Sequence, residues 1–394
     1  MTIRYFWSGV VAVVRRELRR IAADREYRAV TLWLPLGVIL FFAIFFSKEV
    51  VGTLPIAVVD EDNSSLSRKI VTMIRATQQV ALVYEVADMV EAQQLLLQGK
   101  VVGIVEIPNN LSKDILSGGT ARVIYYDSGT NVSTNSLSAK GVQTAITSFG
   151  VGVELQRAEM TGVMPNEAVA QVMPIGFLTY GLFNPWLNYA YYIAPCFLVM
   201  ILIITAMLST IYTVGTELRY ATSVEWLRSA NGSLIAALIG KLSPTTFALW
   251  LLALFVGMLI FGIFGAPMQG SWVVLVVGTI SLVMAYQAVA LFVLALTASF
   301  RLSLSLGGGY SVLAFTFSGV TFPTIAMLSA VQPFTMLFPY TYFMQLYIDQ
   351  AVRGSAWWLS VQDVAAMLLF CLLPLLVLGR LKRVAINRKY WGRL

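Results

Sequence analysis

Charged residues are almost absent from the long middle of this chain. The stretch 168–300 carries only five. All five lie in one short island: Glu217, Arg219, Glu225, Arg228 and Lys241. Charged side chains are costly inside a bilayer, and about 20 consecutive apolar residues suffice to cross one as a helix. The pattern therefore predicts membrane-spanning helices on both sides of a charged loop.

The composition supports a polytopic membrane protein. Only 12% of the residues are charged, against about 25% in soluble domains, and 58% are hydrophobic. The chain has no histidine, which excludes histidine-based acid–base catalysis, proton relays and zinc sites. Its two cysteines, Cys196 and Cys371, lie in apolar runs. We expect buried thiols, no disulfide framework and no metal site.

The basic residues indicate how the chain is oriented. Seventeen of the 27 fall in four places: the N-terminal stretch 4–28, the island 217–241, Arg301 and the tail 380–393. The stretch 48–167 instead carries nine basic and thirteen acidic residues. By the positive-inside rule, the four basic places face the cytoplasm. This distribution follows the expected membrane topology, so we expect no nucleic-acid partner.

Six membrane spans are predicted, with both termini in the cytoplasm. Residues 1–28 form an amphipathic helix at the cytoplasmic interface, and residues 381–394 a basic cytoplasmic tail held by anionic lipid. The segment 323–354 contains Pro323, Pro333 and Pro339, so we expect an outer re-entrant pair of half-helices within the five-helix block 171–380. The predicted spans are 29–48, 189–214, 243–264, 272–298, 302–322 and 356–378.

Residues 49–170 form the only expected soluble domain, a periplasmic α/β domain inserted between spans 1 and 2. Strands and helices alternate along it, which is typical of an α/β fold with a mixed sheet. A long helix over 131–160 returns toward the membrane. The predicted strands are 54–60, 80–86, 101–108 and 121–127.

No nucleotide-binding motif is present. Gly240-Lys241 lacks the P-loop pattern, because that motif needs glycine at 235 and Ser or Thr at 242, where this chain has Ile235 and Leu242. The run Gly307-Gly308-Gly309 favours close helix packing. We therefore expect no ATP hydrolysis by this chain and no cofactor of its own.

Several stretches in this order resemble the ABC-2 type permease family, the membrane subunits of bacterial type-2 ABC exporters, over nearly the whole chain. The resemblance rests on 54–67 and 103–112 in the α/β domain, on Glu217, Glu225-Trp226-Leu227-Arg228 and Gly240-Lys241 in the island, and on 338–342 before the last span. It implies a separate ABC ATPase subunit that binds ATP, a second permease half, and a location in the bacterial inner membrane.

The resemblance also implies that the segment 215–241 is the coupling segment on which the ATPase docks. It gives the coupling role to Glu217, Arg219, Glu225, Arg228 and Lys241, with Trp226 and Leu227 as apolar anchors. An amphipathic helix of this kind can fill a groove on a soluble partner. The alternative is that the loop is charged merely because loops between spans are exposed to water. The family often has a denser charged run here, so the docking contacts can differ in detail.

The leading functional hypothesis is an exporter subunit for an amphipathic lipid or drug-like molecule. Its substrate path would use the polar residues Gln287, Thr297, Ser303 and Ser305. The outer domain could guide substrate to a periplasmic adaptor or gate the exit. One alternative is an ion-coupled secondary transporter, which the scarcity of ionisable residues at midmembrane disfavours. The other is a non-transporting scaffold with a sensing domain.

Three smaller features complete the predictions. Asp349 and Arg353 are four residues apart, and we expect a structural ion pair. Asp363 near the outer end of the last span is a functional candidate because it is ionisable. The aromatic residues before and at the start of span 2 are typical of an interfacial belt: Phe177, Tyr180, Phe183, Trp186, Tyr189, Tyr191 and Tyr192.

Overall fold

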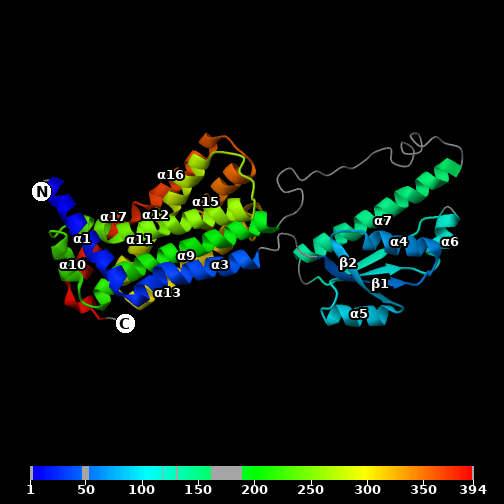
Figure 1. Ribbon diagram of the computed structural model, residues 1–394, viewed down its shortest axis with the longest axis horizontal. Coiled ribbons are helices and arrows are strands. Elements are labelled where there is room, and N and C mark those ends of the chain that lie inside the picture. Colours follow the sequence, from blue (N-terminus) through cyan, green and yellow to red (C-terminus); the bar gives the residue numbers. More distant parts are fainter. Residues whose placement is uncertain (1–2, 47–52, 118, 130–131, 161–188, 393–394) are drawn as a thin grey trace. The chain divides into compact units, whose positions relative to one another are not determined.

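The computed structural model describes residues 3–46, 53–117, 119–129, 132–160 and 189–392. The chain forms two compact units, one of Met1–Glu49 with Leu182–Leu394 and one of Val50–Gly181. The first is helical and the second combines strands and helices (Figure 1).

The α/β unit contains a four-stranded mixed sheet, as the sequence predicts. Its order is β2-β1-β3-β4; β1 pairs in parallel with β2 and β3, and β3 pairs antiparallel with β4. The strands are β1 Leu54–Asp60, β2 Val80–Val86, β3 Gly103–Ile107 and β4 Ile124–Asp127. The helices are α4 Ser65–Arg75, α5 Met89–Leu97, α6 Leu111–Leu116 and α7 Val132–Met160.

Helices cover both faces of this sheet. Ser64 begins α4 with a capping box, its hydroxyl accepting from the amides of Leu66 and Ser67; this arrangement satisfies amides that have no partner within the helix. Helices α4, α6 and α7 share one core with Ile56 and Val58 of β1. Helix α5 lies on the other face and packs Ala92 on Val59. Figure 1 shows α4 and α7 on one side of the strands and α5 on the other.

The helical unit begins with α1 Ile3–Ala23, which leads through α2 Arg25–Arg28 and the π-helical turn η1 Ala29–Trp33 into α3 Leu34–Phe45. The following long helices are α9 Tyr189–Arg219, α11 Leu234–Gly257 with its π-helical end η2 Met258–Ile263, α12 Trp272–Thr297, α13 Phe300–Phe317, and α16 Val361–Phe370 with α17 Leu373–Ile386. Shorter elements are α10 Ser223–Ser229, η3 Thr324–Ala326, α14 Gln332–Thr335, α15 Pro339–Tyr347, η4 Ile348–Val352, η5 Trp357–Ser360 and η6 Arg388–Tyr390.

Five helical stretches of the described residues are long and apolar enough to cross a membrane: Arg25–Phe45, Ile193–Arg219, Leu234–Ile263, Trp272–Thr297 and Trp357–Ile386. Each overlaps a predicted span. The remaining predicted span, 302–322, is not among them. Helix α13 occupies that place and packs along α9, but it ends at Phe317 after only 18 residues. Its serines and three glycines also lower its hydropathy. The sixth span stays a prediction.

One boundary differs from the sequence prediction. Helix α11 begins at Leu234 instead of Ser243, so Lys241 lies inside a helix. The segment 323–354 is a series of short helices, of which α15 and η4 form the longest continuous piece. The predicted ion pair there is confirmed: Arg353 Nη1 lies 3.0 Å from Asp349 Oδ1. Of the expected aromatic belt, Phe177, Tyr180, Phe183 and Trp186 lie outside the described residues.

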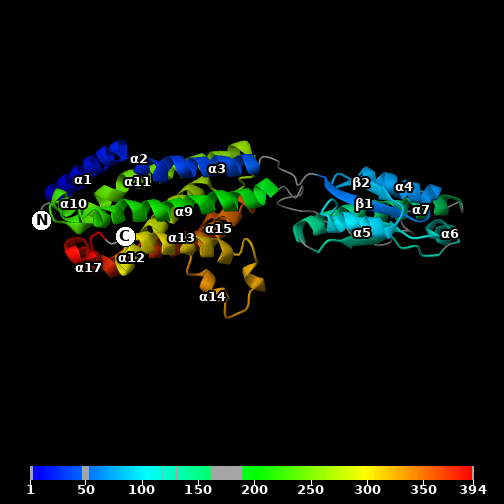
Figure 2. The same ribbon diagram turned by 90° about the horizontal axis from the view of Figure 1, so that it is seen from below.

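One end of the helical unit gathers segments from the whole chain. A shared apolar cluster joins Val10 of α1, Leu218 of α9, Trp226 of α10, Leu294 of α12 and Leu381 of α17. Figures 1 and 2 show α1, α10, α17 and both marked termini at this end. We call it the terminal end of the helical unit. The basic places that the sequence assigns to one membrane side therefore meet in space.

Candidate functional site

The charged island folds into a tight helical turn. Helix α9 ends at Arg219, α10 spans seven residues, and α11 begins at Leu234. The connections need left-handed backbone at Ala221, Asn231 and Gly232, whose φ angles are 59°, 56° and 78°. The side-chain amide of Asn231 also donates from Nδ2 to the backbone oxygen of Tyr5 at 2.9 Å. The turn thus holds the start of α1 against it.

Helix α10 has one face inside the protein and one outside. Trp226 is 1% exposed and donates its indole N–H to the backbone oxygen of Ala237 at 3.2 Å. Leu227 is buried beside it, whereas Glu225 and Arg228 are exposed. The resemblance to ABC-2 permeases predicts that Trp226 and Leu227 anchor a partner. Their apolar surfaces instead pack in this chain's own cluster, because a bare seven-residue helix needs tertiary packing to be stable.

A buried ionic network lies directly behind α10. Lys241 is fully buried, and its Nζ is 2.6 Å from Glu17 Oε2 and 2.7 Å from Glu217 Oε1. Glu217 also accepts from Arg20 at 2.9 Å and from Arg16 at 3.1 Å. Charge-assisted bonds of this kind are the strong ones among protein hydrogen bonds. The network joins α1, α9 and α11.

Hydroxyl groups extend this network. The Tyr27 hydroxyl lies 2.8 Å from Glu17 Oε1, to which it donates, and 2.6 Å from Thr213 Oγ1. Thr222 donates to Glu217 Oε2, and the Lys241 ammonium lies 5.7 Å from the centre of the Trp226 ring. The last contact is within cation–π range. Helix α10 is therefore connected to the network through both its preceding turn and its buried tryptophan.

The members of this network have a small net positive charge. Glu17 and Glu217 face Lys241, Arg16 and Arg20, which gives two negative and three positive groups. One nitrogen of Arg16, Nη1, is buried without a hydrogen-bond partner among the described residues. Removing one member of a buried ion pair costs about 3–5 kcal/mol, because the remaining charge is left uncompensated. Loss of one member should therefore loosen the contact between α1 and the spans.

Sequence reasoning missed Glu17 and Tyr27. Glu17 is the single acidic residue within α1, among five arginines. This isolated acidic residue was the sequence feature that could have indicated a buried ion pair. A carboxylate is repelled by an anionic lipid surface, so a helix that only lies on such a surface would not favour it. Arg219, the remaining island residue, is half-buried, and its guanidinium carbon lies 5.6 Å from the centre of the Phe300 ring.

The tail also contributes to the terminal end. Arg380 of α17 donates to the backbone oxygens of Ala295 and Leu296, both at 2.7 Å. These are carbonyls of the last turn of α12, where a cation is favoured by the helix dipole. The Gly392 amide donates to the backbone oxygen of Leu218 at 3.2 Å. The end of the described chain thus closes onto α9 next to α10.

The residues expected along a substrate path do not share one cavity in the described part of the chain. Gln287 is buried and accepts from Thr246 of α11 at 2.9 Å. The hydroxyl oxygens of Thr297 and Ser303 lie 2.6 Å apart, and this hydrogen bond joins the end of α12 to the start of α13. Ser305 is exposed. Asp363, the other polar candidate, is buried in the first turn of α16.

The chain matches a known protein family over most of its length. The sequence model of the family described as ABC-2 family transporter protein matches residues 25–380. No curated protein and no solved structure matches the chain. Since the family match covers most of the chain, including the ionic network except for α1, the protein belongs to the ABC-2 family of transporter proteins, the membrane permeases that work with a separate ABC ATPase subunit.

Proposed function

We propose that this protein is the permease half of an ATP-driven exporter in the bacterial cytoplasmic membrane. Its substrate is an amphipathic lipid or drug-like molecule, in keeping with the uncharged centres of its spans. ATP is bound by the partner ATPase, and a second permease half, identical or related, completes the transporter. The α/β unit faces the periplasm, where an adaptor protein can bind it.

The observation that carries this proposal is the division of α10 into two faces. Glu225 and Arg228 point away from the chain, whereas Trp226 is buried against α11. An exposed charged face on a rigidly held helix suits a soluble partner that must pull on the membrane helices. We therefore assign docking to Glu225, Arg228 and the partly exposed Arg219.

Force from the ATPase would reach the spans through the buried contacts. The Ser223 hydroxyl donates to the backbone oxygen of Glu217 at 2.9 Å, at the end of α9. Trp226 connects α10 to the first turns of α11. Lys241 then joins these two helices to α1 through Glu217 and Glu17. A displaced α10 would move all three helices together.

Two further placements follow from the gathering of basic segments. Arg4, Arg219 and Lys389 belong to elements at the terminal end of the helical unit. Arg301 follows Phe300, whose ring lies 5.6 Å from the guanidinium carbon of Arg219. We assign this end to the cytoplasm, with both termini on that side, because basic residues flank spans there. Its surface arginines and lysines would contact anionic membrane lipids.

The test reverses the exposed charges of α10. Glu225→Lys with Arg228→Glu should greatly reduce the ATPase subunit that co-purifies in mild detergent, and should abolish substrate-stimulated ATP hydrolysis. The protein itself should remain folded, because exposed charges away from special features change stability by at most about 0.5 kcal/mol. Quantitative mass spectrometry of the purified complex gives the stoichiometry.

The matched control makes the same reversal at an exposed ion pair elsewhere, Asp349→Lys with Arg353→Glu. This variant should retain the ATPase. Equal ATPase recovery from the α10 variant and the wild type would refute the docking assignment. Purification of the wild type without any ATPase would refute the exporter proposal itself and favour a carrier or scaffold.

A further inference from the structure

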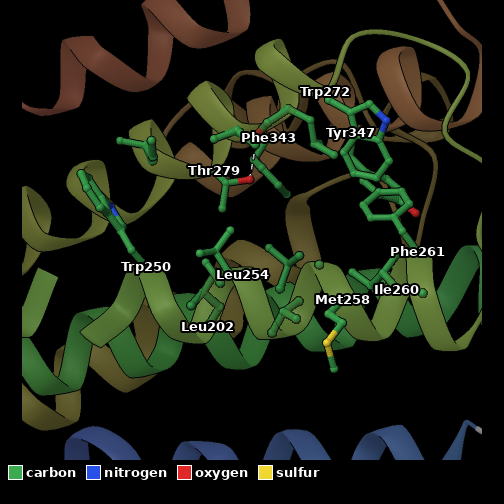
Figure 3. A pocket seen from close by; sticks show the side chains of 18 residues that line it. Leu202, Trp250, Leu254, Met258, Ile260, Phe261, Trp272, Thr279, Phe343 and Tyr347 are labelled. Atoms are coloured by element: carbon green, nitrogen blue, oxygen red, sulfur yellow. Dashed lines mark hydrogen bonds between the residues drawn. The ribbon is translucent and has the colours of Figure 1, made fainter. Parts of the chain in front are cut away.

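A large apolar pocket lies between the spans, away from the ionic network. It has a volume of about 490 Å³, within the 300–1,000 Å³ range of small-molecule sites. Its walls come from α9, the second half of α11 with η2, the first turns of α12, and α15 (Figure 3). On α11 it begins at Trp250, more than two turns beyond Lys241. We call it the α11–α12 pocket.

The lining of this pocket excludes charged groups. None of its 18 lining residues is charged. The Thr279 hydroxyl donates to the backbone oxygen of Leu275 at 2.8 Å, so it is already satisfied. The other polar atoms of lining side chains are the indole nitrogens of Trp250 and Trp272 and the hydroxyl of Tyr347. Water needs two to four polar partners to occupy a cavity stably, and the pocket wall supplies almost none.

Aromatic rings close one end of the pocket. The Phe261 and Trp272 rings meet edge to face, with centroids 4.8 Å apart, and Phe261 lies 6.3 Å from the Tyr347 ring. Figure 3 shows these three residues grouped at one end and Trp250 at the other. Trp272 is also the first residue of α12. Tryptophan and tyrosine at the ends of spans typically mark the level of lipid headgroups.

One side of the pocket is open at Gly257, which has no side chain. A Cβ built on Gly257 would meet no atom within 4 Å. Gly257 is followed directly by the π-helical turn η2, and π-helical turns within α-helices are frequent at functional sites. Leu254 and Met258 at this side are 63% and 55% exposed. A slender apolar guest could therefore enter sideways from the bilayer.

We propose that the α11–α12 pocket binds one hydrocarbon chain of a membrane phospholipid, with the headgroup at the level of Trp272. The lining is apolar, both walls are helices long enough to span the membrane, and the aromatic end lies where headgroups belong. Lipid chains surround such helices, so hydrocarbon fills a cavity that water does not. This site is independent of the proposed ATPase docking.

The test uses the full chain in phosphatidylcholine vesicles containing a phosphatidylcholine with a photoreactive diazirine in the middle of one acyl chain. After irradiation, mass spectrometry maps the labelled peptides. We expect labelling concentrated in 250–262 and 272–280. Gly257→Leu, which places a side chain in the open space, should reduce this labelling severalfold. Ala253→Leu should act in the same direction and provides a second variant if the first is poorly expressed.

Gly308→Leu is the matched control, because a Cβ there also meets nothing within 4 Å but Gly308 lies on α13, outside the pocket. It should leave the labelling of 250–262 unchanged. Labelling spread evenly over all lipid-facing spans, or unaffected by Gly257→Leu and Ala253→Leu, would overturn the proposal. So would efficient disulfide cross-linking of two copies through Met258→Cys, since a second copy would then cover the opening. None of these measurements requires an ATPase.

Discussion

Lys241 is the residue on which the ionic network depends most. It contacts both buried carboxylates, and Glu17 has no second ion-pair partner among the described residues. Lys241→Met should lower protein stability by about 3–5 kcal/mol, because Glu17 would be left as an uncompensated buried charge. The apparent Tm in detergent, followed by intrinsic fluorescence, measures the effect.

The double variant Lys241→Met with Glu17→Gln separates pairing from packing. Removing both charges should restore much of the lost stability, since neutral replacement of a buried ion pair is often tolerated. A double-mutant cycle gives the coupling energy directly. A Lys241→Met protein that melts like the wild type would contradict the importance given to this contact.

The island residues illustrate what can be predicted one residue at a time. The charge of the island was visible because it stands alone in a long uncharged stretch. The sequence did not show that Glu225 is exposed and Trp226 is buried in this chain, because both residues are typical of an amphipathic helix, whichever surface it packs on. The buried state of Lys241 depends on Glu17, more than two hundred positions earlier, and no local pattern reports such a pairing.

Helix α1 rests on α11 through a point of very close approach. A Cβ at Gly240 would lie 2.7 Å from the Val10 backbone oxygen and 2.8 Å from Val13 Cβ. Small residues at helix crossings allow this spacing. Gly240→Val should therefore push α1 away and weaken coupling to the ATPase. A cysteine introduced at Val13, 1% exposed in the native protein, should then react faster with a water-soluble maleimide.

Gly37→Val is the control for this element, because a Cβ at Gly37 meets no atom within 4 Å. The measurement is made with Cys196 and Cys371 replaced by alanine. Maleimide reaction at position 13 should be unchanged by the Gly37 substitution. If Gly240→Val also leaves it unchanged, α1 is not held by this contact.

Element boundaries were predicted well where caps and apolar runs agree. The strands β1 and β2 begin and end at the predicted residues, because each is bounded by a polar turn. The sequence predicts a start at Ser243 for the span in α11, whereas the helix begins at Leu234, because a charge such as that of Lys241 is typical of a loop. A buried partner overrides that signal. Helix α13 coincides with the predicted span 302–322, but Gly307, Gly308 and Gly309 lower its hydropathy, so its role as a span stays a prediction.

At the scale of the whole molecule, the terminal end of the helical unit brings together parts of the chain that are far apart in the sequence. Its cluster unites the first helix, the island and the end of α17. A partner docked on α10 would therefore contact a structure built from the beginning, the middle and the end of the chain. Sequence alone predicted the common membrane side of these segments from their basic residues, but their mutual contacts required the tertiary structure.

The α/β unit should fold without the membrane helices. It has its own core, in which Ile56, Ile70 and Val105 are at most 1% exposed, and helices cover both faces of its sheet. A protein comprising residues 53–160 should be soluble and unfold cooperatively on heating, as small single domains usually do. Circular dichroism measures the transition. Val58→Asp, which buries a charge in the same core, should abolish it. A gradual loss of signal in the unsubstituted unit would mean that its sheet needs the remainder of the chain.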